Sequence, residues 1–125
     1  RFLDLGSGFG GTVLALAAKQ GQGECVGIES APLPFVFSWL RVTFSGLPQA
    51  RVVHGDFWKF DLAGYDVVYA FLSPAPMAEL FRKARAEMLP GSLFVANTFE
   101  VPGETPERTI ALEDWRRGRL LVWRM

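Results

Sequence analysis

The chain starts with Arg1-Phe2-Leu3-Asp4-Leu5-Gly6-Ser7-Gly8-Phe9-Gly10-Gly11, and this stretch decides the fold. Its first five residues have the length and apolar character of a short core strand, whereas the glycines that follow favour a tight turn. Helix-forming residues then run from Thr12 to Lys19. The order of strand, glycine turn and helix is typical of the first unit of a parallel α/β sheet.

Strands and helices alternate along the rest of the chain, as apolar periodicity and the positions of glycine and proline indicate. Asp66–Leu72 is the clearest strand, because its continuous apolar run is typical of a central strand buried on both faces. The alternation implies a mostly parallel sheet with right-handed crossovers. In chain order we expect a strand over Glu24–Glu29, a helix over Phe35–Phe44, strands over Arg51–His54 and Asp66–Leu72, a helix over Met77–Met88 and a strand over Ser92–Phe99.

The tail breaks this alternation. A Pro/Gly-rich turn over Pro102–Pro106 precedes two short β-like segments, Thr109–Leu112 and Leu120–Trp123, which lie on either side of Arg117-Gly118. This pattern favours a terminal antiparallel hairpin over another crossover helix. The expected fold class is therefore α/β: a Rossmann-like, doubly wound, mostly parallel sheet that ends in an antiparallel hairpin.

The length and composition narrow the class of protein. The 125 residues suit one hydrophobic core, so we expect residues 1–125 to form a single domain. The first expected strand begins at once and without Met, so we also expect a preceding segment to be missing. No apolar run approaches the roughly 20 residues of a membrane-spanning helix. Thirteen basic residues balance thirteen acidic ones, so the sequence lacks the broad positive charge of a nucleic-acid-binding protein.

Several conspicuous residues are expected to be structural. The single Cys25 cannot form an internal disulfide, and together with the single His54 it falls short of a zinc ligand set, so we expect a cytoplasmic protein without a structural metal. We expect Cys25 to pack in the core and His54 to end a strand. Trp115 and Trp123 are expected to pack in the hairpin, and Arg116, Arg117 and Arg119 to lie on a solvated face.

Acidic residues lie at or just after the ends of the first three expected strands, at the edge where ligands of parallel sheets bind. Gly6 and Gly8 suit a tight turn whose backbone lies close to a ligand. The spacing Gly6-x-Gly8-x-x-Gly11 also satisfies the dinucleotide fingerprint, with Glu29 near its ribose-binding acid, so these residues alone fit both NAD and S-adenosylmethionine.

Two further carboxylates favour S-adenosylmethionine. Asp4 would repel a pyrophosphate but attract the ammonium group of a methionine moiety, and Asp56 can accept a hydrogen bond from an adenine amino group. Glu29 can bind the two ribose hydroxyls, because one carboxylate offers two oxygens to two O–H donors. Phe57 or Trp58 could stack on the adenine.

The stretch Asp4-Leu5-Gly6-Ser7-Gly8-Phe9-Gly10 resembles the first motif of class I S-adenosylmethionine-dependent methyltransferases, and Glu29 and Gly55-Asp56-Phe57 match their ribose and adenine positions. The resemblance covers nearly the whole chain. It implies S-adenosylmethionine as the cofactor, bound by the following residues: Asp4, Gly6, Ser7, Gly8, Gly10, Glu29, Asp56 and Phe57.

A narrower resemblance points to the small protein-lysine methyltransferases, a family that includes the mitochondrial ATP synthase c-subunit enzyme and archaeal and bacterial relatives. It implies a sheet of about seven strands whose last two form a hairpin, and an acceptor lysine that enters near the end of the fourth strand. We expect Tyr69, Phe71, Ser73 and Pro74 to form the acceptor slot, although Tyr69 and Phe71 also suit plain core positions. The motifs that carry this resemblance are Gly55-Asp56-Phe57-Trp58-Lys59, Tyr65-Asp66-Val67-Val68-Tyr69, Phe71-Leu72-Ser73-Pro74, Asn97-Thr98-Phe99 and Pro102-Gly103.

The sequence departs from related patterns in two places. The family's usual segment ahead of the first strand, which helps to cover the cofactor, is absent. Phe71-Leu72-Ser73-Pro74 replaces the Asn/Asp-Pro-Pro-aromatic motif of enzymes that methylate DNA bases and glutamine, which argues against those acceptors. A small-molecule or RNA methyltransferase, a non-catalytic S-adenosylmethionine-binding module and, less well supported, an NAD-dependent oxidoreductase are the alternatives to a protein-lysine methyltransferase.

Overall fold

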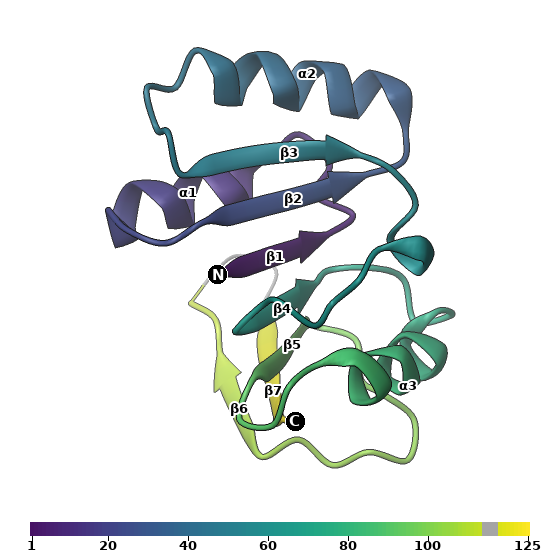
Figure 1. The fold of residues 1–125 in the computed structure, drawn as a ribbon. Coiled ribbons are helices and arrows are strands. Elements are labelled where there is room, and N and C mark those ends of the chain that lie inside the picture. The colour runs from purple at the N-terminus through teal and green to yellow at the C-terminus, as the bar shows by residue number, and fades with distance from the viewer. Residues whose placement is uncertain (114–117) are drawn as a thin grey trace. The chain divides into compact units, whose positions relative to one another are not determined.

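The computed structural model of the chain describes residues 1–113 and 118–125. The chain forms two compact units, Arg1–Asp61 and Leu62–Met125, which we call unit 1 and unit 2 (Figure 1). In the described part of the chain, no helix is both long enough and apolar enough to cross a membrane.

Unit 1 is a parallel three-stranded sheet with two α-helices. Its strands are β1 (Phe2–Leu5), β2 (Cys25–Glu29) and β3 (Ala50–His54), and β2 lies in the middle, paired in parallel with both others. The arrows of all three strands point the same way in Figure 1. Helices α1 (Gly11–Gln20) and α2 (Pro32–Thr43) both pack against β2 and β3, and a short 3₁₀ helix, η1 (Phe57–Lys59), follows β3.

Two glycines allow the elements of unit 1 to approach closely. A Cβ atom on Gly27 of β2 would lie 2.6 Å from the Cβ of Ser7 and 2.9 Å from a methyl carbon of Val13, so no larger residue fits without displacement. Gly10, at the start of α1, has a φ of 81°, and a Cβ there would lie 3.1 Å from the Cβ of Ser38 in α2. The glycine turn is therefore packed between β2 and α2.

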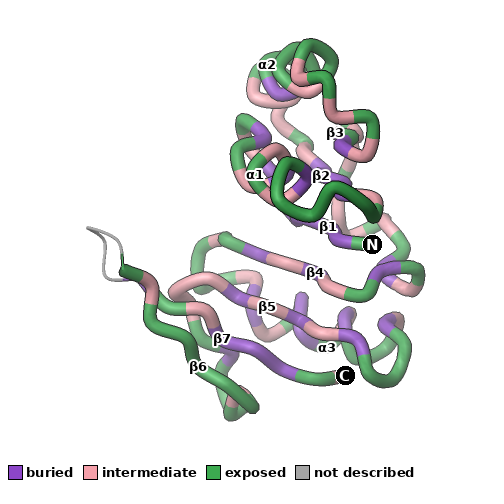
Figure 2. The backbone as a smooth tube through the Cα atoms, turned by 90° about the vertical axis from the view of Figure 1, so that its left-hand side faces the viewer, coloured by how far each residue is buried: buried purple, intermediate pink, exposed green. Residues whose placement is uncertain are grey.

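Unit 2 contains β4 (Val67–Ala70), α3 (Met77–Glu87), β5 (Leu93–Asn97), β6 (Arg108–Ala111) and β7 (Arg119–Arg124). β4 and β5 are parallel, whereas β7 pairs antiparallel with both β5 and β6. The core forms where Phe81 of α3 meets Phe94 of β5 and Trp123 of β7, with ring centroids 5.3 to 5.6 Å from Phe81. Figure 2 shows the contrast between the buried middle of β7 and the exposed β6.

The structure confirms the predicted fold class and every helix and strand predicted from the sequence, including the terminal hairpin, with shifts of a few residues at the ends. Cys25 is buried, His54 ends β3, and Trp123 packs in the hairpin, as predicted. Arg119 is half-exposed and donates a hydrogen bond of 2.6 Å to Glu100. Trp115, Arg116 and Arg117 lie outside the described residues.

Two predictions about the fourth strand were wrong. The strand ends at Ala70 rather than at Leu72, and its residues alternate between half-buried and buried rather than being buried on both faces. The pairing of β4 with β5 stops at Ala96, and two residues later Thr98 adopts a left-handed backbone with a φ of 71°. Phe71 does not continue the pairing, although Asn97 still belongs to β5, and Phe71 is 41% exposed.

Candidate active site

The glycine turn after β1 is fastened to the end of β2. The N–H groups of Gly6 and Ser7 both donate to the carbonyl oxygen of Ile28, at 2.9 and 3.0 Å. Gly6 and Gly8 have φ values of 71° and 56°, a backbone region that favours glycine. A Cβ on Gly8 would meet no atom within 4 Å, so the backbone at Gly8 borders open space. The turn is thus rigidly held on one side and accessible to a ligand on the other.

Glu29, the last residue of β2, connects the glycine turn to the start of α2. Its Oε1 accepts a hydrogen bond of 2.8 Å from the N–H of Gly8, and its Oε2 accepts one of 2.9 Å from the N–H of Ala31. An ionised carboxylate has about four acceptor positions, so about two of them are left for further donors. Two adjacent hydroxyl groups on a ligand would match the acceptors that are left.

Asp4 is the only acidic residue of the described chain that is buried. Burial raises the pKa of its carboxyl group to about 7, and the negative charge of Glu29 contributes to the increase. Asp4 pairs in register with Gly27, two residues before Glu29 on the neighbouring strand. A cation bound beside Asp4 would stabilise the ionised carboxylate, so the position favours a positively charged ligand group.

Asp56 and Phe57 lie just beyond the end of β3. The register of β2 and β3 places His54 opposite Glu29, and the N–H of Gly55 donates to the carbonyl oxygen of Glu29 at 3.1 Å. Oδ1 of Asp56 accepts from the N–H of Trp58 at 3.0 Å and so caps η1. Phe57 is half-buried, and its ring centroid lies 4.8 Å from that of Trp58. Asp4, Glu29 and Asp56 therefore gather at one edge of the unit 1 sheet, as the sequence predicted.

Two other residues of the predicted cofactor set have side chains or backbone groups directed into the protein. The side chain of Ser7 lies over Gly27, and its buried hydroxyl has no hydrogen-bond partner in the structure. The N–H of Gly10 donates to the carbonyl oxygen of Ser7 at 3.0 Å, and the Cα of Gly10 faces Ser38. Both residues shape the turn, which is a packing role that the motif alone does not reveal.

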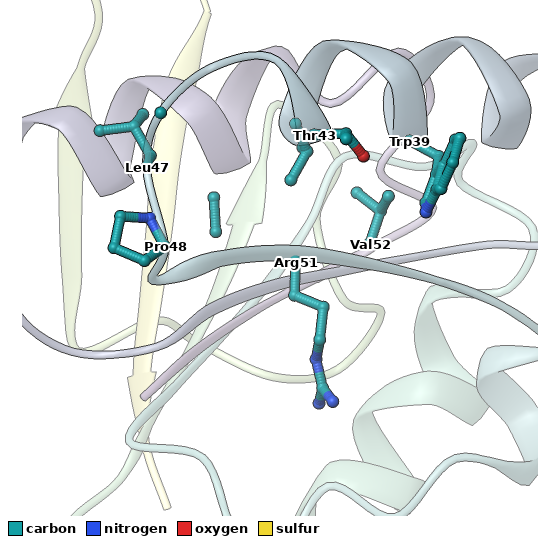
Figure 3. Close-up of a pocket in the computed structure, with 9 residues that line it drawn as sticks. Trp39, Thr43, Leu47, Pro48, Arg51 and Val52 are labelled. Atoms are coloured by element: carbon teal, nitrogen blue, oxygen red, sulfur yellow. The ribbon is translucent and has the colours of Figure 1, made fainter.

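A separate hollow of about 460 Å³ lies between the last turns of α2 and the start of β3 (Figure 3). Trp39 and Thr43 of α2 and Arg51 of β3 are among the residues that line it. None of its lining residues belongs to the predicted site, and it lies at the beginning of β3, whereas Glu29 and Asp56 follow strand ends. The hollow therefore does not coincide with the predicted cofactor site.

In unit 2 the predicted acceptor residues lie at and after the end of β4. Tyr69 is the last residue but one of the strand and is half-buried, whereas Phe71, Ser73 and Pro74 follow the strand and are exposed. The ring of Phe71 lies near that of Phe99, with 6.3 Å between the centroids. The structure thus adds Phe99, which follows β5, to the aromatic surroundings of the predicted slot.

A side-chain network that the sequence did not reveal reaches Tyr69. Asn97, the last residue of β5, donates from Nδ2 to the hydroxyl oxygen of Tyr69 at 2.8 Å. The hydroxyl of Thr98 in turn donates to Oδ1 of Asn97, also at 2.8 Å. Asn97 and Thr98 carried part of the family resemblance but had no assigned role. The signal that could have found them is the position of a polar residue at the end of the strand that neighbours Tyr69.

Residues 4–108 match the model of the ANTKMT methyltransferase domain. The chain belongs to this family. A protein-lysine N-methyltransferase of Saccharolobus islandicus is 29% identical over 112 residues, which is 89% of this chain and 70% of that protein. The matched region includes every residue of the predicted cofactor and acceptor sites.

Solved structures agree with the family. The crystal structure of an RNA methyltransferase from Salinibacter ruber with bound S-adenosylhomocysteine has a TM-score of 0.89 and 26% identity, covering 98% of this chain and 78% of that chain. A methyltransferase from Thiobacillus denitrificans, also with bound S-adenosylhomocysteine, has a TM-score of 0.67 and covers 84% and 45% of the two chains; its 22% identity supports the fold alone. The ANTKMT-family chain is therefore an S-adenosylmethionine-dependent methyltransferase.

The residues of unit 1 in this ANTKMT-family enzyme suit the chemical groups of S-adenosylmethionine. The buried Asp4 suits the cofactor's ammonium group, the open backbone at Gly8 allows close approach, and Glu29 has acceptor positions left for hydroxyl donors. In the described residues, no group of three or more His, Cys, Asp or Glu side chains is arranged to hold a metal ion.

Proposed function

We propose that this ANTKMT-family methyltransferase transfers a methyl group to the side-chain nitrogen of lysine residues in proteins. The observation that carries the proposal is the match of 89% of the chain to a protein-lysine N-methyltransferase, in a region that contains Tyr69, Phe71, Ser73 and Pro74. The aromatic character of these surroundings suits a long aliphatic side chain that ends in an amine.

In this proposal the cofactor is held by residues of unit 1. Asp4 binds the ammonium group, Glu29 the two ribose hydroxyls and Asp56 the adenine amino group through its second oxygen, with Phe57 against the adenine ring. Gly6 and Gly8 let the ligand approach the backbone, while Ser7 and Gly10 shape the turn from within. When bound, S-adenosylmethionine supplies an electrophilic methyl group. The carbon–sulfur bond breaks as the carbon–nitrogen bond forms, and the bonding electron pair leaves with sulfur. The methylated nitrogen then loses its extra proton to solvent.

The acceptor amine must be neutral when it attacks. With a reference pKa of about 10.4, deprotonation of a lysine costs roughly 4 to 5 kcal/mol at pH 7. The rings of Phe71 and Phe99 lie near each other after β4 and β5 and offer apolar surface, and removal of water from the ammonium group disfavours its charged form. The proposed task of the slot is therefore to desolvate and align the amine, because no covalent intermediate with the enzyme is needed.

RNA methylation is the second candidate, because the Salinibacter ruber structure carries that description. The charge distribution supports the protein acceptor instead. The net charge is zero, and three arginines of unit 2 each pair with a glutamate rather than forming a basic surface. The pairs are Arg119 with Glu100, Arg85 with Glu104 and Arg124 with Glu107.

Transfer of label into a cell extract distinguishes the candidates. The enzyme is incubated with methyl-labelled S-adenosylmethionine and extract, and the products are separated with and without ribonuclease or protease. We expect protease-sensitive label that yields methyl-lysine on acid hydrolysis. Label that ribonuclease removes would replace the lysine proposal with RNA, and label only in small molecules would exclude both. Asp4→Asn serves as the control, because it should reduce labelling without abolishing the fold.

A further inference from the structure

Two residues of unit 2, Asn97 and Thr98, form a hydrogen-bond network that reaches the Tyr69 hydroxyl. The network runs from Thr98 through Asn97 to Tyr69, with two hydrogen bonds of 2.8 Å. Because the Thr98 hydroxyl donates to Oδ1 of Asn97, the amide is oriented with Nδ2 towards Tyr69. The phenol oxygen therefore accepts a hydrogen bond from Asn97, and its position is fixed relative to the end of β5.

The backbone at Thr98 is strained, and the strain is held in place. A β-branched residue at a φ of 71° is a genuine outlier, and such outliers tend to occur at functional sites. The N–H of Thr98 donates to the carbonyl oxygen of Arg119 in β7 at 2.7 Å, which anchors the turn. Gly118 adjoins the same network: a Cβ there would lie 3.4 Å from the Thr98 hydroxyl.

We propose that Asn97, oriented by Thr98, is a positioning residue that fixes the Tyr69 hydroxyl for alignment of the acceptor amine. This inference rests on the proposed function, because it assumes that Tyr69 lies in the acceptor slot. Asn97 acts through Tyr69 and does not itself contact the reacting atoms. The strained turn at Thr98 sets the direction of the Asn97 amide, and the end of β5 thereby controls the geometry at the end of β4.

The contact itself is tested by NMR, independently of any acceptor. The chain has two tyrosines, Tyr65 and Tyr69, so tyrosine labelled with ¹³C at Cζ gives two signals, which Tyr69→Phe assigns. We expect Asn97→Ala and Thr98→Val to shift the Tyr69 signal and to leave that of Tyr65 in place. Thr98→Ser keeps the hydroxyl and should leave both signals unchanged. An unmoved Tyr69 signal in Asn97→Ala would overturn the inference.

The catalytic consequence is tested by a double-mutant cycle with poly-L-lysine as the acceptor probe. We expect Asn97→Ala to lower kcat about tenfold, with the dissociation constant for S-adenosylhomocysteine unchanged. In the Tyr69→Phe background the same change should alter kcat less than about twofold, since Asn97 then has no hydroxyl to hold. An equal loss in both backgrounds would overturn the inference.

The two measurements separate this inference from the proposed function. If the wild-type enzyme methylates no lysine, the proposed function fails, and with it the catalytic part of the inference, even where the NMR signal of Tyr69 moves. If lysine is methylated but the cycle is additive, the proposed function stands and the positioning role of Asn97 is wrong. If Thr98→Ser keeps the wild-type kcat and Thr98→Val lowers it, the comparison supports the role of the Thr98 hydroxyl.

Discussion

Asp4 changes its charge state when the protein folds. Its pKa of about 7 is above the usual 3.8, so the folded protein binds a proton that the unfolded chain releases between these values. The free energy of unfolding of the cofactor-free enzyme therefore falls as the pH rises from about 4 to about 7. The same loss of a proton produces an ionised Asp4 carboxylate, which can bind a cationic ligand as the pH approaches neutrality.

We predict that the affinity for S-adenosylhomocysteine rises with pH through Asp4. Binding of the ligand ammonium requires the ionised carboxylate, so a pKa of about 7 makes binding about tenfold weaker at pH 6 than at pH 8. Calorimetry at both pH values, in buffers of different ionisation enthalpy, measures the affinity and the release of up to about one proton at pH 6. Asp4→Asn should bind more weakly at pH 8 and lose the pH dependence. An unchanged pH dependence in this variant would assign the proton to another group.

Glu29 is expected to serve both the ligand and the fold. Glu29→Gln offers one carbonyl oxygen where the carboxylate offers two oxygens, so it cannot accept the N–H groups of both Gly8 and Ala31 and also bind two hydroxyls. We predict that this variant weakens S-adenosylhomocysteine binding about 30-fold and lowers the free energy of unfolding by about 1 kcal/mol. Glu79→Gln, which removes an exposed charge from the first turn of α3, is the matched control for ligand binding and should leave the affinity unchanged. Wild-type affinity in Glu29→Gln would exclude Glu29 as the ribose ligand.

The sequence predicted the acidic residues of the candidate site because their position follows from a simple rule. Asp4, Glu29 and Asp56 each lie at or near the end of an expected strand, and parallel strands bring their ends together. The same rule marks the position of Asn97 at the end of β5, but it does not predict what Asn97 does. Its role depends on the φ of Thr98 and on the direction of one amide group, and neither is encoded in residue type or spacing.

At the scale of the elements, Gly27 controls how closely β2 approaches the glycine turn. We predict that Gly27→Ala lowers the free energy of unfolding by about 3 kcal/mol, because its Cβ would lie 2.6 to 2.9 Å from Ser7 and Val13. Urea denaturation measures the effect. Gly11→Ala is the control: its Cβ meets nothing within 4 Å, and in helix α1 it should be neutral or stabilise by up to about 1 kcal/mol.

A second variant identifies the contact responsible. In a Ser7→Gly background the clash with the serine side chain is absent and only that with Val13 is left, so Gly27→Ala should cost clearly less there. An equal cost in both backgrounds would attribute the effect to the strand backbone rather than to the turn. Gly27 was not singled out from the sequence, because a glycine within a strand indicates a close approach without naming its partner.

The helices and strands themselves were predictable, because each has its own local signal. α3 follows from apolar residues at three- and four-residue spacing, and β5 from a β-branched and aromatic run after Pro90-Gly91. The end of β4 was not predictable, because Phe71 and Leu72 have strand-like composition. Where the strand stops depends on its pairing with β5, whose last pair is Ala70 with Ala96, and local sequence does not contain this information.

At the scale of the whole molecule, zero net charge coincides with an exposed apolar helix face. Leu33, Phe37, Leu40 and Phe44 follow one another at spacings of four, three and four residues, and so share one face of α2 and its end. All four are exposed, Leu33 and Phe44 by more than 80%. An isolated apolar side chain on a surface is ordinary, but a continuous apolar face favours association, and a net charge near zero does not oppose it.

We predict that the protein self-associates most near its isoelectric point of about 6.8 and less at pH 8.5, where it is negatively charged. Light scattering against protein concentration at both pH values measures this. Replacing Leu33 and Phe44 with lysine should abolish most of the association at pH 6.8. Leu89 and Ile110 are exposed apolar residues of unit 2, and their replacement with lysine adds the same charge without changing α2. Both double variants shift the isoelectric point by the same amount. If both reduce self-association equally, net charge alone causes it. If only the Leu33 and Phe44 variant reduces self-association, the α2 face is its cause.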